Sequence, residues 1–280
     1  MSIDTLAATP VSELLILALL VSLSGAIAGV IAGMLGVGGG IVLVPVLFQA
    51  FTFLQIDEAL RMPLAVGTSL ATIIPTSIRS TISHHKLGSV DWQLLRAWSA
   101  PTVIGVVVGA WAASIIGGHG LKLAFAIGAA CLGLFMLLGK EEWRLADQAP
   151  LGLGAWPLGA LNGGLSVLMG IGGGTFGVLM MTLCGATMHR AVATAAGFGA
   201  IIAIPGSIGM MINGWDASAL PPFSLGYVNL VGVALIVPAT LLSAPVGARL
   251  AHRLSRSALR RAFGLFLCLT ALRMSWAYFA

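Results

Sequence analysis

Charged side chains are scarce in this sequence. They make up 8% of its 280 residues, whereas a soluble domain carries about 25%. The hydrophobic fraction is 58% and the mean hydropathy is +1.03. Several apolar runs reach the ~20 residues that are needed to cross a hydrocarbon core. The composition therefore excludes a soluble globular domain and predicts a protein that crosses the membrane several times.

Acidic residues are the rarest charged group, and none of the nine falls in the middle of a predicted membrane segment. They lie in predicted loops or at segment ends, namely Asp4, Glu13, Asp57, Glu58, Asp91, Glu141, Glu142, Asp147 and Asp216. A carboxylate within the membrane would mark a proton relay. The sequence offers no candidate for such a relay.

Cysteines and catalytic motifs are also sparse. Cys131, Cys184 and Cys268 lie far apart within apolar runs and have no metal-ligand spacing, so we interpret them as small buried hydrophobic residues. The segment Gly206-Ser207-Ile208-Gly209 is not the G-x-S-x-G motif of hydrolases, and HExxH is absent. We therefore expect neither a metal site nor enzyme activity, and an intramembrane hydrolase is the least favoured alternative.

Glycine, by contrast, is abundant and organised. The stretch Gly36-Val37-Gly38-Gly39-Gly40 returns as Gly170-Ile171-Gly172-Gly173-Gly174, each time inside an apolar run. Non-helical backbone at membrane depth is tolerated only where protein covers it or where it lines a polar cavity. Glycine-interrupted segments at matching places in two halves indicate the binding site of a transporter. Close helix packing is the alternative explanation.

The two glycine motifs are suited to binding an anion. Successive backbone N–H groups of a glycine-rich turn, followed by the positive end of a helix, can bind an oxyanion. We expect helices to begin at about Gly40 and Gly174. The predicted substrate-binding residues are Gly36, Gly38, Gly39, Gly40, Gly170, Gly172, Gly173 and Gly174, with the hydroxyls of Thr68 and Ser69. For these hydroxyls, bonding within their own helix or between helices is the alternative.

Apolar runs and their glycine, proline and polar boundaries predict ten membrane segments. Their ranges are 12–35, 40–54, 62–82, 92–116, 121–138, 151–169, 174–186, 190–212, 225–248 and 257–279. The second and seventh are too short to cross as straight helices, and each begins at a glycine motif. The predicted fold class is an all-α polytopic membrane protein with two short helices interrupted by glycine.

The segments form two copies of a five-segment repeat. An offset of 134 positions relates Gly25, Gly29 and Gly36 to Gly159, Gly163 and Gly170. Offsets of 130 and 138 relate later positions, including Ser77 to Ser207 and Gly109 to Gly247. Because five is odd, the second copy enters the membrane from the opposite side, which predicts an inverted repeat. The predicted units are residues 1–148 and 149–280, joined near the charged linker 139–150.

The basic residues predict the orientation in the membrane. With both termini on the outer side, 11 of the 14 basic residues lie on the cytoplasmic side, as the positive-inside rule requires. The three outside are Arg61, Lys122 and Arg273. If the two short segments did not cross the membrane, the 14 basic residues would divide 6 against 8 between its two sides. Orientation thus accounts for the net charge of +5, and we expect the bilayer, not nucleic acid, to be the partner. The sequence indicates no particular oligomeric state.

Two arginines are candidates for an electrostatic funnel. Arg61 and Arg79 lie near opposite ends of the third segment, where arginine side chains more often extend to the membrane surface. His84 and His85 follow Arg79 in a predicted loop, and without a third ligand at suitable spacing they do not indicate a metal site.

Two further stretches belong with the paired glycine motif in a family pattern. They are Ala65-Val-Gly67-Thr-Ser69 and Lys86-Leu-Gly88-Ser-Val-Asp91-Trp. With these residues the sequence resembles the sulfite exporter TauE/SafE family over nearly its whole length. The resemblance implies a bacterial cytoplasmic-membrane transporter of sulfite or small organosulfur and organic anions, without a cofactor. It also implies that the glycine motifs, with Gly67, Thr68 and Ser69 beside them, form the pore and the substrate site.

The second copy departs from this pattern. It has Gly197-Phe198-Gly199 where the first copy has Gly67-Thr68-Ser69. We therefore expect specificity to depend on the first copy, with Phe198 as a candidate gate.

The prediction from sequence is a secondary transporter that exports a small sulfur-containing oxyanion, sulfite or an organosulfonate. An anion leaving a negative-inside cell gains about 2.3 kcal/mol per charge per 100 mV, so export needs no coupling ion. A sodium site built from backbone carbonyls would contradict uncoupled export. The alternatives are ion-coupled import of a sulfonate or small carboxylate, and a passive anion channel.

Overall fold

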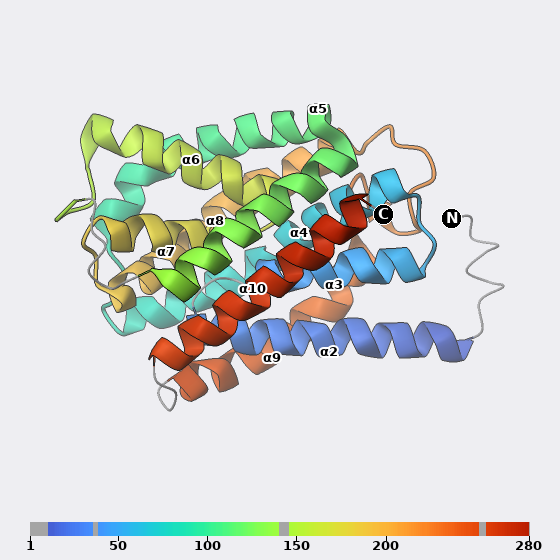
Figure 1. Ribbon diagram of the computed structural model, residues 1–280, viewed down its shortest axis with the longest axis horizontal. Coiled ribbons are helices and arrows are strands. Elements are labelled where there is room, and N and C mark those ends of the chain that lie inside the picture. Colours follow the sequence, from blue (N-terminus) through green and yellow to red (C-terminus); the bar gives the residue numbers. More distant parts are fainter. Residues whose placement is uncertain (1–10, 36–38, 140–145, 252–255, 280) are drawn as a thin grey trace.

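The computed structural model describes residues 11–35, 39–139, 146–251 and 256–279, and these residues are predominantly helical (Figure 1). The helices are α2 (Val11–Leu35), α3 (Gly40–Phe53), α4 (Glu58–Lys86), α5 (Trp92–Leu138), α6 (Ala155–Leu168), α7 (Gly174–Leu183), α8 (Met188–Asn213), α9 (Leu230–Ala251) and α10 (Arg256–Phe279). A 3₁₀ turn, Gly152–Gly154, precedes α6. Two strands, β1 (Ser224–Leu225) and β2 (Val228–Asn229), precede α9. The all-α prediction is confirmed apart from these two short strands.

The predicted short helices are present. Helix α3 has 14 residues and α7 has 10. At a rise of 1.5 Å per residue, neither spans a ~30 Å hydrocarbon core as a straight helix. Both begin at the predicted glycine, Gly40 or Gly174.

Helix α5 is longer than any predicted segment because it combines two of them. Its 47 residues contain one break at Gly117, where φ is 61° and ψ is −166°. Figure 1 shows the chain running along the molecule before this break and turning back after it. The two arms of α5 correspond to the predicted segments 92–116 and 121–138.

The start of the ninth predicted segment was wrong. The sequence predicts a helix from residue 225, but α9 begins at Leu230. Residues 224–229 form an antiparallel hairpin in which Leu225 pairs with Val228. The turn residue Gly226 has a φ of 53°, which favours glycine and does not fit a helix.

Two pairs of helices pack in parallel at glycines. In the first pair, Gly25 of α2 contacts Ile236 of α9, and Gly29 lies against Thr240 one turn further along both helices. The second pair consists of the first arm of α5 and α6. Gly105 and Gly109 of α5 lie against Ala160 and Gly164 of α6. Without a side chain on these glycines, the backbones can approach closely.

Two other pairs pack antiparallel. Near the centre, Gly67 of α4 lies beside Met210 of α8, and Ser77 lies beside Gly199. The second arm of α5 packs in the same manner on α10, where Gly133 contacts Cys268 and Leu137 contacts Gly264. The helix directions in these pairs fix how the two halves of the chain fit together.

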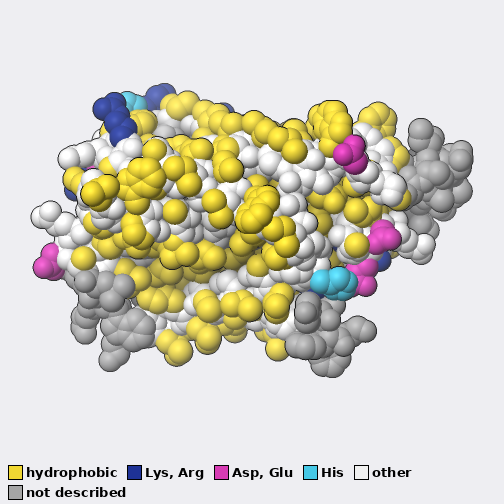
Figure 2. All heavy atoms as spheres, turned by 90° about the horizontal axis from the view of Figure 1, so that it is seen from above, with side chains coloured by type: hydrophobic (Ala, Val, Ile, Leu, Met, Phe, Trp, Pro, Cys, Tyr) yellow, Lys and Arg dark blue, Asp and Glu magenta, His cyan; other side chains and the backbone are white. Residues whose placement is uncertain are grey.

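The surface is suited to a bilayer. Among the described residues, three helical stretches are long and apolar enough to cross a membrane: Trp92–Leu138, His189–Asn213 and Leu230–Gly247. Figure 2 shows hydrophobic side chains over the middle of one face and most of its charged side chains near the two ends of the long axis. This distribution is that of a multi-pass membrane protein.

Lys122 is an exception to the pattern of charges at the surface. Its side chain is only 2% exposed, and its Nζ lies 2.7 Å from Oε1 of Glu58, at the start of α4. The same Nζ lies 5.5 Å from the centroid of the Phe48 ring. This residue, expected at the outer end of the fifth predicted segment, therefore links α5 to α3 and α4.

Candidate functional site

The last two glycines of each motif, Gly39-Gly40 and Gly173-Gly174, form the same backbone structure at the starts of α3 and α7. Gly39 precedes α3 with φ 73° and ψ −12°, and Gly173 precedes α7 with φ 68° and ψ −6°. Both conformations are left-handed, which side chains disfavour. Neither helix start has a side-chain hydrogen-bond cap. Because the first N–H groups of a helix have no acceptor within it, each start is a source of donors.

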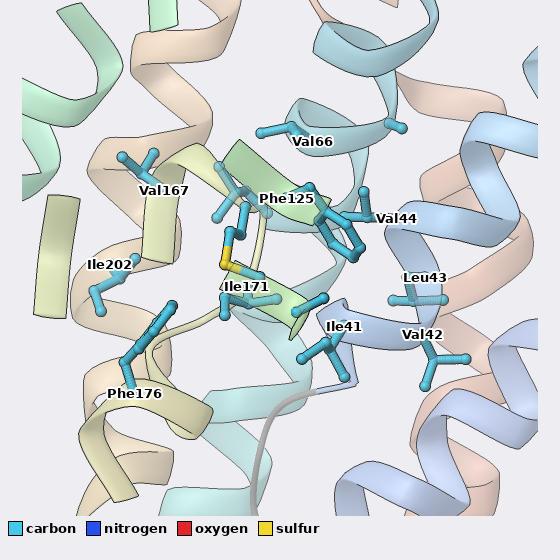
Figure 3. Packing of buried hydrophobic residues seen from close by; sticks show 14 of the residues in the cluster. Ile41, Val42, Leu43, Val44, Val66, Phe125, Val167, Ile171, Phe176 and Ile202 are labelled. Carbon is cyan, nitrogen blue, oxygen red and sulfur yellow. The ribbon is translucent and has the colours of Figure 1, made fainter. Parts of the chain in front are cut away.

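The two motifs contact each other directly. A methyl group placed on Gly40 would lie 2.6 Å from the carbonyl oxygen of Gly170 and 3.1 Å from Cα of Ile171. Ile41 and Ile171, beside the two breaks, both contribute to the apolar cluster at this level (Figure 3). The centre between the motifs is therefore closely packed. Gly36 and Gly38 lie outside the described residues.

The hydroxyls of Thr68 and Ser69 support the backbone at this centre. The Oγ of Ser69 donates a hydrogen bond to the carbonyl of Gly170 over 2.8 Å. The Oγ1 of Thr68 accepts one from the backbone N–H of Asn229 over 2.9 Å. Both side chains are completely buried. The structure thus connects both hydroxyls, which the sequence grouped with the glycines, to the second half of the chain.

A cavity of about 290 Å³ leads toward the second motif between α4, α8 and α9. Its outer part is lined by the exposed residues Arg79, Ser83 and Leu87, whereas Gly172 and Gly199 at its inner end are buried. Ser77, Ser80 and Thr240 also line it. Among the described residues that line this cavity, none is acidic. The guanidinium group of Arg79 and the hydroxyl of Ser80, without a carboxylate beside them, favour an anionic occupant.

The two candidate funnel arginines differ in position. Arg79 lines the cavity, near the C-terminal end of α4. Arg61 lies at the other end of α4, where its Nε donates a hydrogen bond to the carbonyl of Ile56 over 2.6 Å. Arg61 is thus bound to the loop that precedes α4 and does not line this cavity.

Phe198, the candidate gate, is completely buried beside the second motif. Its ring centroid lies 6.2 Å from that of Trp98, with an angle of 43° between the planes. Its Cβ would lie 3.5 Å from a methyl group placed on Gly173. Phe198 does not line the cavity, although its neighbour Gly199 does.

The sequence interpretation missed most of the cavity wall. His84 belongs to the last turn of α4, where a loop was expected, and it lines the cavity with Ser80 and Ser83. The sequence did contain a signal for these residues. Hydroxyl side chains recur along α4 every three or four residues, and this spacing continues from Thr76 to Ser80 and Ser83 near the end of the helix. Thr240 carried no such signal, because it lies on α9 and reaches the cavity only through the packing of helices that are distant in the sequence.

Within the described residues, Ser207 is not placed for hydrolysis, and no cluster of metal ligands is found. Ser207 is buried, and its Oγ donates a hydrogen bond to the carbonyl of Ile204 in its own helix. No group of three or more His, Cys, Asp or Glu side chains that could hold a metal ion was found in the part of the chain that the structure describes.

Known proteins resemble this chain over most of its length. A family model described as "Sulfite exporter TauE/SafE" matches residues 21–274. A probable membrane transporter protein of Haemophilus influenzae is 34% identical over 260 residues, which cover 91% of this chain and 97% of that protein. One from Methanocaldococcus jannaschii is 26% identical over 89% of this chain and 91% of its own length. No solved structure matches.

Proposed function

The chain belongs to the sulfite exporter TauE/SafE family of membrane transporters, and we propose that it exports a small sulfur-containing oxyanion, sulfite or an organosulfonate, across the bacterial cytoplasmic membrane. It acts in this proposal as a secondary transporter and not as an enzyme. The proposal extends the family assignment to a substrate class, a direction and a membrane.

The cavity between α4, α8 and α9 is the observation that carries this proposal. It extends from the exposed Arg79 to the buried Gly172 of the second glycine motif. Arg79 attracts an anion at the outer part, and the hydroxyl of Ser80 provides a donor along the wall. Its volume of about 290 Å³ accommodates a small oxyanion with its water. Beyond Gly172, the contact between the two motifs closes the path.

The membrane potential provides the driving force in this proposal. A monovalent anion that leaves a negative-inside cell gains about 2.3 kcal/mol per 100 mV. No acidic side chain lines the described cavity wall, so the wall offers no carboxylate for a proton relay. Export therefore proceeds without a coupling ion.

Helix packing supports the proposed inverted repeat of residues 1–148 and 149–280. In this repeat, α2 of the first copy corresponds to α6 of the second, and the first arm of α5 corresponds to α9. The pair of α2 and α9 therefore corresponds to the pair of α6 and the first arm of α5, and both pairs are parallel. The same correspondence maps α4 onto α8, which run antiparallel. Ten crossings related by an axis in the membrane plane account for these directions.

The proposed orientation places both termini on the outer side. In Figure 1 the N-terminal end of α2 and the C-terminal end of α10 lie toward the same end of the molecule. The opposite end includes the C-terminal end of α4 and the cavity mouth at Arg79. The positive-inside rule assigns this end to the cytoplasm, so the cavity receives its substrate from the cytoplasm.

Sulfite flux through purified protein in proteoliposomes tests this proposal. A potassium-diffusion potential of either sign is applied without a proton or sodium gradient. We expect flux to follow the potential, to saturate with sulfite, and to show counterflow, which a passive channel lacks. Flux that appears only with a proton or sodium gradient would contradict uncoupled export, and absence of sulfite flux under every gradient would contradict the substrate.

A further inference from the structure

Two buried polar side chains of α6 have no partner in the described structure. Asn162 and Ser166 are completely buried, and Oδ1 and Nδ2 of Asn162 and Oγ of Ser166 make no hydrogen bond with other described residues. Burying an amide or a hydroxyl without a partner costs about 1–3 kcal/mol in proteins. Three such atoms within one helical turn indicate that something else binds there.

Both side chains face the start of α7. They are four residues apart and therefore lie on one face of α6. A methyl group placed on Gly177 would lie 3.6 Å from both Oδ1 and Nδ2 of Asn162. The carbonyl of Ser166 accepts a hydrogen bond over 2.9 Å from the N–H of Ile171, within the second motif. The pair is thus adjacent to the first turn of α7, whose N–H groups are donors.

The same place lies directly behind the inner wall of the cavity. Ala195 of α8 lines the cavity. Its Cβ would also lie 3.7 Å from a methyl group placed on Gly177, on which Asn162 packs. Ala195 and Gly177 therefore lie between the cavity and Asn162.

We propose that Asn162 and Ser166, with the first turn of α7, form an oxyanion-binding site that the transported anion occupies after it leaves the cavity. This inference rests on the proposed function. The amide N–H, the hydroxyl and the helix N-terminus all donate to the oxyanion. Oδ1 of Asn162 accepts a hydrogen bond from a protonated oxygen of the anion or from a bound water.

The site belongs to the second copy alone. At the offset of 134 positions, the first copy has Ala28 and Ala32 in place of Asn162 and Ser166. The second copy thus supplies polar side chains from α6, although its third helix has Phe198 and Gly199 where the first copy has hydroxyls.

Three substitutions test the site by sulfite efflux from proteoliposomes and by thermal unfolding in detergent. Asn162→Leu removes the polar atoms at similar volume, so the thermal midpoint stays equal or rises while the KM for sulfite rises at least tenfold. Asn162→Asp adds a negative charge, which lowers efflux at least a hundredfold. Ser166→Ala raises KM about threefold.

Thr102→Val is the control for these substitutions. Thr102 has an equally buried, unpartnered hydroxyl, but it belongs to α5, so efflux by Thr102→Val stays at the wild-type value.

The outcomes separate this site from the proposed function. Wild-type kinetics in Asn162→Leu would overturn the site while leaving sulfite export intact. Retained efflux in Asn162→Asp would indicate a cation site and would also overturn the proposal. A second measurement does not require flux: sulfite or methanesulfonate is expected to raise the thermal midpoint of the wild type but not of Asn162→Leu. If the wild type carries no sulfite, the export proposal fails, and equal stabilisation of both proteins, or of neither, then overturns the site.

Discussion

Gly39 and Gly173 start α3 and α7 with almost the same backbone conformation, but they touch different parts of the protein. A methyl group on Gly39 would lie 3.1 Å from the backbone carbonyl of Ala28. On Gly173 it would lie 2.1 Å from Cδ1 of Ile202, the end of a side chain. The first break is therefore enclosed by backbone and the second by side chains that can be replaced.

The polar groups near the breaks are distributed just as unequally. At corresponding positions, α4 has hydroxyls where α8 has an aromatic residue, a glycine and an aliphatic residue; the pairs are Thr68 with Phe198, Ser69 with Gly199 and Thr72 with Ile202. The two halves thus share backbone geometry and differ in chemistry. A substrate between them contacts different groups on its two sides.

The largest effect is expected where the two breaks meet. Gly40→Ala forces a methyl group to within 2.6 Å of the carbonyl of Gly170, and backbone is unable to yield as a side chain does. We expect sulfite efflux per inserted protein to fall at least a hundredfold. Gly164→Ala is the control, because its nearest contact would be an ordinary 3.4 Å. Equal activity of the two variants would show that contact between the breaks is not required.

Alanine at the two caps sharpens the comparison of their surroundings. Gly39→Ala and Gly173→Ala both place alanine in a left-handed conformation, which costs about 1–2 kcal/mol, so each is expected to lower efflux about tenfold. Adding Ile202→Val removes the Cδ1 atom that contacts residue 173 and should restore about half of the loss in Gly173→Ala. The same change should give no recovery in Gly39→Ala, and recovery in both would contradict the assignment of their neighbours.

The two arginines of α4 allow the ends of that helix to be compared. Arg79→Glu reverses the charge at the cavity mouth and should lower the initial rate of sulfite efflux about fivefold, with a smaller effect at high salt because exposed charges are screened. Arg61→Gln, at the other end, should leave the salt dependence unchanged. If Arg61→Gln changed the rate and its salt dependence while Arg79→Glu did not, the cavity mouth would lie at the other end of α4.

The smallest effect is expected for single hydroxyls of α4. Ser69→Ala removes the hydrogen bond to Gly170 and should lower the free energy of unfolding by about 1 kcal/mol and efflux about threefold. Thr72→Ala loses only a bond within its own helix, to the carbonyl of Ser69, and should change both by less. Thermal unfolding in detergent and efflux measure the difference, and a larger effect of Thr72→Ala would contradict the bridging role of Ser69.

The sequence was sufficient for features that depend on local chemistry. The duplicated glycines predicted both helix starts, at Gly40 and Gly174, because the backbone there requires glycine. Apolar runs located the described helices, including the two arms of α5. The hairpin before α9 was missed because strands of two residues show no periodicity.

The cavity and the polar pair depend on packing between distant segments. Thr240 and Ala244 reach the cavity from α9, more than 150 positions after Arg79 in the sequence. Asn162 was overlooked because a single amide in an apolar run forms no pattern. Its burial without a partner becomes visible only when α7 is packed against it.

The most direct test of the account is whether the cavity carries the substrate. Ala244 lines it, whereas Leu242 on the same helix is 79% exposed and does not. Sulfite efflux is measured from proteoliposomes with Ala244→Trp, which fills the cavity, and with Leu242→Trp as the matched control. The account predicts that Ala244→Trp inserts normally and loses efflux while Leu242→Trp retains it. Wild-type efflux in Ala244→Trp would contradict the central claim.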